Sequence, residues 1–96
     1  AALGEREGPE AYLDHVRRWR GRFSREVNHR VYPSQANFVL VDIAPSRSDP
    51  VTEALASRGV LVRSCRSFPG LEDHYIRVSI GEDWENERFI TEINRP

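Results

Sequence analysis

Two arginines that lie in strand-like segments are the side chains best suited to chemistry in this sequence. Arg63 is the second-last residue of the segment Val60–Ser64, and Arg77 lies inside the segment Tyr75–Ile80. If these two strands are neighbours, both guanidinium groups converge near one edge of a sheet. Each guanidinium group can match a carboxylate or a phosphate with two parallel, charge-assisted hydrogen bonds, which are roughly twice as strong as neutral ones. The pair therefore predicts a binding site for an anion.

The alternative is that each arginine forms a structural ion pair with a nearby acid. The candidate acids are Asp42, Glu72 and Asp73. A charged side chain in the middle of a strand with apolar neighbours is costly unless its charge is met by a partner. The partner could be one of these acids or a bound anion, so the residue types alone leave both interpretations open.

Other candidate sites are weaker. Cys65 and His74 could form a thiol nucleophile and its base, but no third group orients the histidine, and a lone cysteine at a strand end is typical of a small buried hydrophobe. The three histidines of the chain have no zinc-ligand spacing, so no metal site is predicted. The chain offers no Gly-rich phosphate-binding loop.

Composition excludes several classes of function. All 14 basic residues are arginine and none is lysine, so no residue can form a Schiff base or serve as a P-loop lysine. The net charge of −1 argues against a dedicated nucleic-acid-binding domain and no apolar run is long enough to span a membrane. A single cysteine suits a reducing cytoplasm. There is no methionine, so we expect a processed chain or a piece of a longer one.

Hydrophobic spacing predicts the elements that position the arginines. A helix begins near Gly8-Pro9, and an arginine-rich face, interpreted as solvated or partner-facing, lies opposite its apolar stripe. That stripe comprises Tyr12, Val16, Trp19, Phe23 and Val27. After Pro33, Ala36–Val41 predicts a strand buried on both faces. A short helix follows, with Asp49 as its N-cap, with Val51, Ala54 and Leu55 facing the core, and with Gly59 at its end.

Two more strands and a helix complete the predicted order. Val60–Ser64 and Tyr75–Ile80 are strands, and in the second of them Ile76, Val78 and Ile80 share one face. Glu82–Asn94 predicts a last helix with Phe89, Ile90 and Ile93 as its apolar stripe. The order is helix, strand, helix, strand, strand, helix. We expect a single α+β domain over residues 1–96, with a small, mostly antiparallel sheet covered by helices.

Four sequence segments together resemble one family. They are Pro33–Val41 (PSQANFVLV), Gly59–Cys65 (GVLVRSC), Phe68–Leu71 (FPGL), and Tyr75–Gly81 (YIRVSIG) with Glu85–Arg88 (ENER). They resemble the C-terminal small domain of fold-type-I pyridoxal-phosphate enzymes, in the branch of histidinol-phosphate aminotransferase and L-threonine-O-3-phosphate decarboxylase. The resemblance extends over residues 9–95 and keeps the family's motif order.

The resemblance implies roles for three residues. Arg77 matches the family arginine that holds the substrate's carboxylate or phosphate, and Arg63 matches a second arginine that helps to hold phosphate. Asn37 matches a supporting asparagine that positions its strand. The large domain, which supplies the Schiff-base lysine and holds pyridoxal phosphate, is absent from these residues. We therefore expect no catalytic, cofactor-binding or metal-binding residue here, and no activity from these 96 residues alone.

The resemblance also implies what the longer enzyme does. It is a cytoplasmic homodimer that acts on a phosphorylated amine or amino acid, in amino-acid or cobalamin biosynthesis. Its small domain contacts its own large domain, and neither nucleic acid nor membrane is a partner. Transamination and decarboxylation both remain open. Two alternatives of another class are a free-standing interaction or regulatory domain that kept the fold, and a nucleic-acid-binding α+β domain.

Overall fold

The protein has three helices and a four-stranded sheet in the part of the chain that the structure describes. The computed structural model describes residues 8–33, 36–66 and 70–95, so Ser34, Gln35 and residues 67–69 of the sequence motifs lie outside it. The elements, in chain order, are α2 (Gly8–Glu26), β1 (Arg30–Pro33), β2 (Phe38–Asp42), α3 (Ser48–Ser57), β3 (Arg63–Ser64), β4 (Tyr75–Ser79) and α4 (Asp83–Ile93). The α+β class is confirmed, and β1 is an additional strand.

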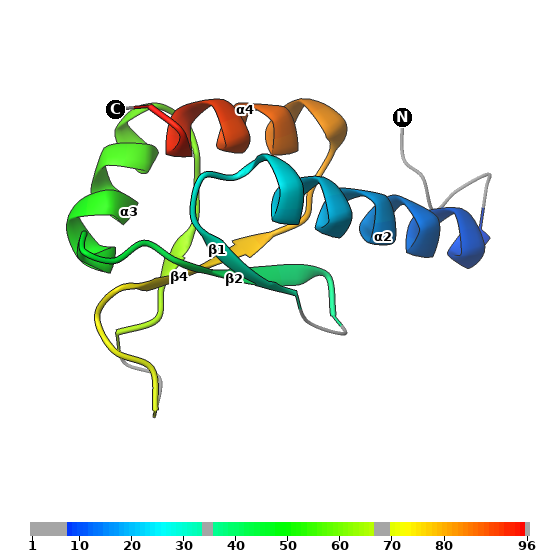
Figure 1. Ribbon diagram of the computed structural model, residues 1–96. Helices are drawn as coiled ribbons and strands as arrows, with labels where there is room; N and C mark the ends of the chain where they lie inside the picture. Colours follow the sequence, from blue (N-terminus) through cyan, green and yellow to red (C-terminus); the bar gives the residue numbers. More distant parts are fainter. Residues whose placement is uncertain (1–7, 34–35, 67–69, 96) are drawn as a thin grey trace.

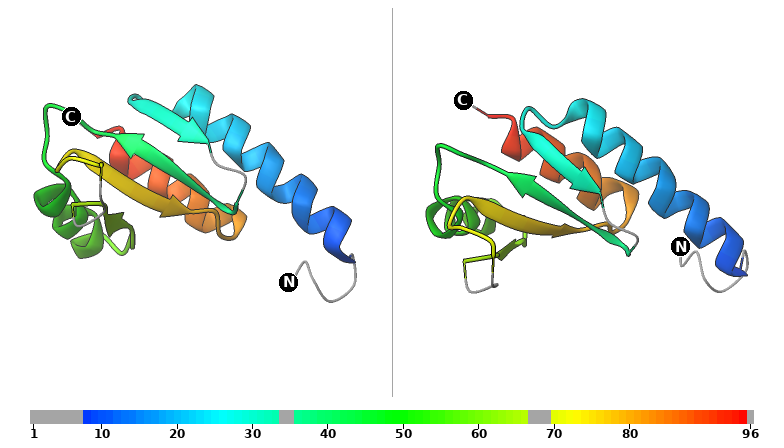
Figure 2. Two further views of the ribbon diagram at one scale, coloured as in Figure 1. Left: turned by 90° about the horizontal axis from the view of Figure 1, so that it is seen from below. Right: turned by 60° about the horizontal axis from the view of Figure 1, so that its bottom comes forward.

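The four strands form one antiparallel sheet in the order β1-β2-β4-β3. Helices α2 and α4 both lie on the same side of this sheet, while α3 lies beside its β3 end (Figure 1, Figure 2). No helix of the described residues lies on the opposite side of the sheet (Figure 1). We call this side the open face. Its presence corrects the expectation that Ala36–Val41 is buried on both sides.

Alternation along β2 and β4 decides which side chains reach the open face. Val39, Val41, Ile76 and Val78 point to the helices and are buried in the core. Their neighbours in the sequence are partly exposed, because successive side chains of a strand point to opposite sides. The register places Tyr32, Leu40, Arg77 and Arg63 in one row across all four strands of the open face.

The helices pack on the sheet through their apolar stripes. Val16, Trp19 and Phe23 of α2 are buried with Val27, which follows the helix, while Tyr12 at the start of the stripe is largely exposed. Phe89, Ile90 and Ile93 of α4 complete this core as predicted. The ring of Phe23 lies 5.5 Å from that of Phe89, which joins the two helices.

Helix α3 differs in detail from its prediction. Its N-cap is Arg47, and Asp49 lies in the first helical turn, so the expected Asp49 N-cap is wrong. Asp49 instead forms an ion pair with Arg66, with 2.9 Å between its Oδ2 and an arginine nitrogen. Leu55 is buried and Val51 packs against the core, whereas Ala54 is exposed. Gly59 ends this segment with a φ of 82°, which favours glycine.

Strand β3 is much shorter than predicted. Only Arg63 and Ser64 pair with β4, opposite Arg77 and Ile76. Val60 is buried, but Leu61 has 84% of its surface exposed, so the segment before Arg63 does not continue the sheet. No helix in the described part of the chain is both long and apolar enough to cross a membrane.

Candidate anion-binding site

Arg63 and Arg77 are brought together as the sequence predicts. They are directly opposite residues in the antiparallel ladder between β3 and β4. Side chains of opposite residues in such a ladder lie on the same side of the sheet, with Cβ atoms about 4.5–5.5 Å apart. Since β3 is the edge strand, both guanidinium groups belong to the open face at one edge of the sheet.

The Arg77 side chain is held over an aromatic ring. Its guanidinium carbon lies 5.2 Å from the centre of the Phe38 ring, a cation–π contact across the β2–β4 ladder. Its Nε is buried and lacks a hydrogen-bond partner among the described residues. A buried, unmatched N–H is costly, so Arg77 has an unfilled capacity for an acceptor.

The acids that could have neutralised the two arginines are engaged elsewhere. Asp42 and Glu72 both contact the ring of His74, at 2.7 and 3.3 Å. Asp73 lies 3.6 Å from Arg47. Within residues 8–33, 36–66 and 70–95, no carboxylate forms an ion pair with Arg63 or Arg77. The structural ion-pair interpretation is therefore wrong for the described residues.

Arg63 and Arg77 both line a cavity of about 300 Å³. Its lining consists of Leu61, Val62, Arg63, Arg77 and Ser79. Two permanently charged residues therefore line a space large enough for a small anion, and no carboxylate is among its lining residues. Chemically, this arrangement can bind and orient an anionic group.

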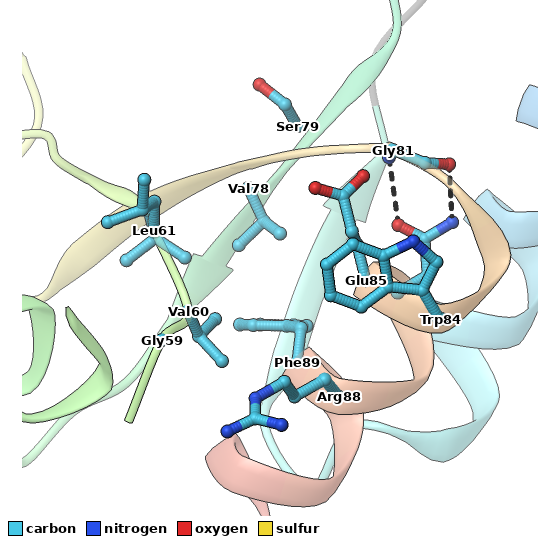
Figure 3. Close-up of a pocket in the computed structure, with 12 residues that line it drawn as sticks. Gly59, Val60, Leu61, Val78, Ser79, Gly81, Trp84, Glu85, Arg88 and Phe89 are labelled. Atoms are coloured by element: carbon cyan, nitrogen blue, oxygen red, sulfur yellow. Dashed lines mark hydrogen bonds between the residues drawn. The ribbon is translucent and has the colours of Figure 1, made fainter. Parts of the chain in front are cut away.

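A second groove of about 260 Å³ adjoins this cavity and shares Leu61, Val62 and Ser79 with it. Figure 3 shows Val60, Val78 and Phe89 in this groove, with the Trp84 ring at one side and Leu61 at the other. Trp84 has 64% of its surface exposed. The groove is lined by apolar side chains together with polar ones, among them Glu85 and Arg88.

Asn37 directly precedes β2 and lies beside the end of β4. Its backbone carbonyl accepts a 2.8 Å hydrogen bond from the Ile80 N–H. Its side-chain Nδ2 donates a 3.3 Å hydrogen bond to the Tyr12 hydroxyl. These bonds join the start of β2 to the end of β4 and to α2. They are consistent with the supporting role that the resemblance implies, which stays a prediction.

The Cys65–His74 pair does not form a catalytic dyad. Cys65 is fully buried, and burial raises the pKa of its thiol, which disfavours the thiolate. Both ring nitrogens of His74 face carboxylates, and the hydrogen bond with Asp42 raises the pKa of this histidine. Among the described residues, no group of His, Cys, Asp and Glu side chains could hold a metal ion.

Sequence reasoning missed the residue that supports the end of β4. Asn86 is buried in the first turns of α4, where its Oδ1 accepts from the Gly81 N–H and its Nδ2 donates to the Gly81 carbonyl, both at 2.9 Å. The dashed lines at Gly81 in Figure 3 mark these bonds. The signal was present, since Asn86 lies in the ENER segment of the resemblance, but its partner is backbone and leaves no trace in the sequence.

Comparisons with known proteins agree with this fold. The chain matches no family model. It is 60% identical to the curated histidinol-phosphate aminotransferase of Methanosphaerula palustris over 93 residues, which are 97% of this chain and 26% of that protein. The chain thus spans about a quarter of the length of the curated relatives it matches.

Solved structures show the same fold. The histidinol-phosphate aminotransferase from Clostridium acetobutylicum matches with a TM-score of 0.73 and 24% identity, over 88% of this chain and 26% of that one. L-threonine-O-3-phosphate decarboxylase from Porphyromonas gingivalis matches with a TM-score of 0.74 and 20% identity, over 85% and 26%. Sequence and fold together identify the chain as a homologue of the small domain of histidinol-phosphate aminotransferases.

Proposed function

We propose that this domain binds the anionic group of a phosphorylated amine substrate within a longer, pyridoxal-phosphate-dependent aminotransferase. The observation that carries the proposal is the cross-strand pair of Arg63 and Arg77, which faces one cavity and lacks an acidic partner among the described residues. Holding the anion fixes how the rest of the substrate presents its reacting bonds. In this role the domain orients the substrate and does not itself perform the reaction.

The cofactor does not fit these 96 residues. Pyridoxal phosphate in such enzymes is attached to a lysine, and this chain has none. We therefore propose that the cofactor is held by polypeptide outside these residues, and that the small domain's share is limited to the substrate. The whole protein would be a cytoplasmic homodimer, as the resemblance implies.

Transamination is the reaction that the comparisons favour. The 60% identical relative is named a histidinol-phosphate aminotransferase, whereas the threonine-phosphate decarboxylase is only 20% identical and supports the fold alone. We accordingly propose histidinol phosphate as the substrate and amino-acid biosynthesis, rather than cobalamin biosynthesis, as the setting.

The test is Arg77→Ala in the full-length protein, with Arg18→Ala on the exposed side of α2 as the matched control. The specificity constant for histidinol phosphate with 2-oxoglutarate is measured for each. Loss of an anchoring charge pair costs about 2–4 kcal/mol, so Arg77→Ala should lower kcat/KM by roughly 30- to 1,000-fold. An unchanged constant would refute the anion-binding role, whereas a full-length wild type without any activity would favour a free-standing interaction domain. Release of carbon dioxide from threonine phosphate would overturn the choice of reaction.

A further inference from the structure

Ser79 lies beside the arginine pair on the same strand. It follows Arg77 by two residues in β4, so the two side chains are on the same face, about 6.6 Å apart along the strand. Ser79 is exposed and lines the same cavity as Arg63 and Arg77. In Figure 3 its hydroxyl points away from Val78 and Phe89, which lie on the core side of the strand.

The early end of β3 leaves space next to Ser79. If the ladder continued beyond the Arg63–Arg77 pair, Leu61 would lie opposite Ser79, but Leu61 is exposed and unpaired with β4. In an antiparallel ladder, backbone groups of every second residue point to the same neighbouring strand. Arg77 pairs with β3, so the backbone N–H and C=O of Ser79, two residues further on, point to the side where β3 would continue. Among the described residues, the Ser79 hydroxyl has no hydrogen-bond partner of its own.

The direction of the acceptor oxygens separates two kinds of anion. A carboxylate has two oxygens in one plane, and two guanidinium groups can satisfy both. A phosphate monoester has three terminal oxygens that point in three directions, so a donor apart from the two arginines can reach an oxygen that a carboxylate lacks. The Cα atoms of Ser79 and Arg77 are about 6.6 Å apart along the strand and both residues line the cavity, so an anion held there by Arg77 lies on the same face as the Ser79 hydroxyl.

From this arrangement we propose that Ser79 is a specificity-determining residue that donates a hydrogen bond to the third oxygen of a substrate phosphoryl group held by Arg63 and Arg77. The inference rests on the proposed function, and it adds a residue and a preference to it. Ser79 makes the site favour a phosphate over a carboxylate, whereas the two arginines alone attract either anion.

The experiment compares Ser79→Ala and Ser79→Thr in the full-length protein, with Ser24→Ala on the exposed side of α2 as control. For each variant, KM and kcat for histidinol phosphate are measured together with competitive inhibition by inorganic phosphate and by acetate. A hydrogen bond to a charged acceptor corresponds to roughly a 10-fold or larger change in affinity. Ser79→Ala should raise KM and the phosphate inhibition constant by about 10-fold and leave acetate inhibition unchanged, and Ser79→Thr should retain phosphate binding.

Equal changes for phosphate and acetate, or no change for either, would overturn the inference. So would a loss of phosphate binding in Ser79→Thr, which keeps the hydroxyl and suits a strand. The outcome is distinct from that of Arg77→Ala. If Arg77→Ala weakens both anions and Ser79→Ala neither, the proposed function stands and only the role of Ser79 fails. If Arg77→Ala weakens neither, the proposed function itself fails.

Discussion

Arg63 and Arg77 face each other directly across the β3–β4 ladder, so two positive charges occupy one cross-strand pair. Like charges in this position destabilise a sheet, and a bound anion relieves the repulsion. The arrangement therefore lowers the stability of the empty domain in favour of its anion-bound form. This links a property of the fold, which can be measured without substrate, to the proposed site.

Replacing one member of the pair should stabilise the domain. We expect Arg63→Gln to raise the free energy of unfolding by about 0.2–1 kcal/mol at low ionic strength. Urea unfolding with and without inorganic phosphate measures this, and phosphate should stabilise the wild type more than the variant. Arg18→Gln, on the exposed side of α2, should leave both values within about 0.5 kcal/mol of the wild type. A stability loss in Arg63→Gln would contradict the repulsion.

The His74–Asp42 pair predicts a dependence of stability on pH. Hydrogen bonding with Asp42 raises the pKa of His74 above 6.5, and hydrogen bonding first with the Ala44 N–H and also with His74 lowers that of Asp42 below 3.8. The contribution of His74 is thus complete below pH 6.5 and is lost as the pH rises through its raised pKa. The contribution of Asp42 to stability is lost as the pH falls through its lowered pKa.

Urea unfolding of the wild type and of His74→Gln across about pH 6 to 8.5 checks this dependence. We expect the free energy of unfolding of the wild type to fall with rising pH in this range, and the slope to be shallower in His74→Gln. Parallel slopes for the two proteins would show that His74 does not cause the pH dependence.

Asn86 should matter more to stability than its polar character suggests. Asn86→Ala removes both hydrogen bonds to Gly81, and of these two partly buried backbone groups only the carbonyl keeps another contact, with His15 Nε2 at 2.8 Å. We expect a cost of about 1–3 kcal/mol, measured as a shift of the thermal or urea midpoint. Asn28→Ala, at an exposed position after α2, is the control. Equal midpoints for Asn86→Ala and the wild type would show that water replaces the amide at no cost.

Phe23 is the central side chain of the core. It is completely buried, and its ring lies 5.9 Å from that of Trp19 and 5.5 Å from that of Phe89. Phe23→Ala should therefore cost about 3–5 kcal/mol, which is a large share of the stability of so small a domain. Tryptophan fluorescence during urea unfolding follows this loss. Leu13→Ala, at a half-exposed position of α2, should have little effect, and similar losses in both variants would contradict this account of the core.

The sequence was sufficient for the helices and for β4 because their apolar spacing is regular. The stripe of α2 is buried from Val16 onward, and the alternation of Tyr75–Ile80 appears as predicted. It was insufficient for β1, since Arg30–Pro33 has only Val31 packed against the core and ends in a proline. It also overextended β3, because a run of Val, Leu and Val favours a strand even where the chain leaves the sheet.

The sequence could predict that the two arginines lie on neighbouring strands. It could not predict that they are directly opposite each other in the β3–β4 ladder. Register depends on where β3 begins, and that position is determined by Gly59 and by burial of Val60 in the core. The contact of Arg77 with Phe38 likewise comes from pairing across β2 and β4. Substrate binding by Arg63 and Arg77, and the support from Asn37, stay predictions.

The same short β3 has a consequence for behaviour at high concentration. The outer strands of a sheet can pair with another molecule and start aggregation. Here one outer strand has two residues and begins with Arg63, and the other begins with Arg30 and ends with Pro33, which has no N–H to donate. Neither offers a long, uncharged backbone edge, so the domain resists intermolecular sheet formation while one face of its sheet stays uncovered.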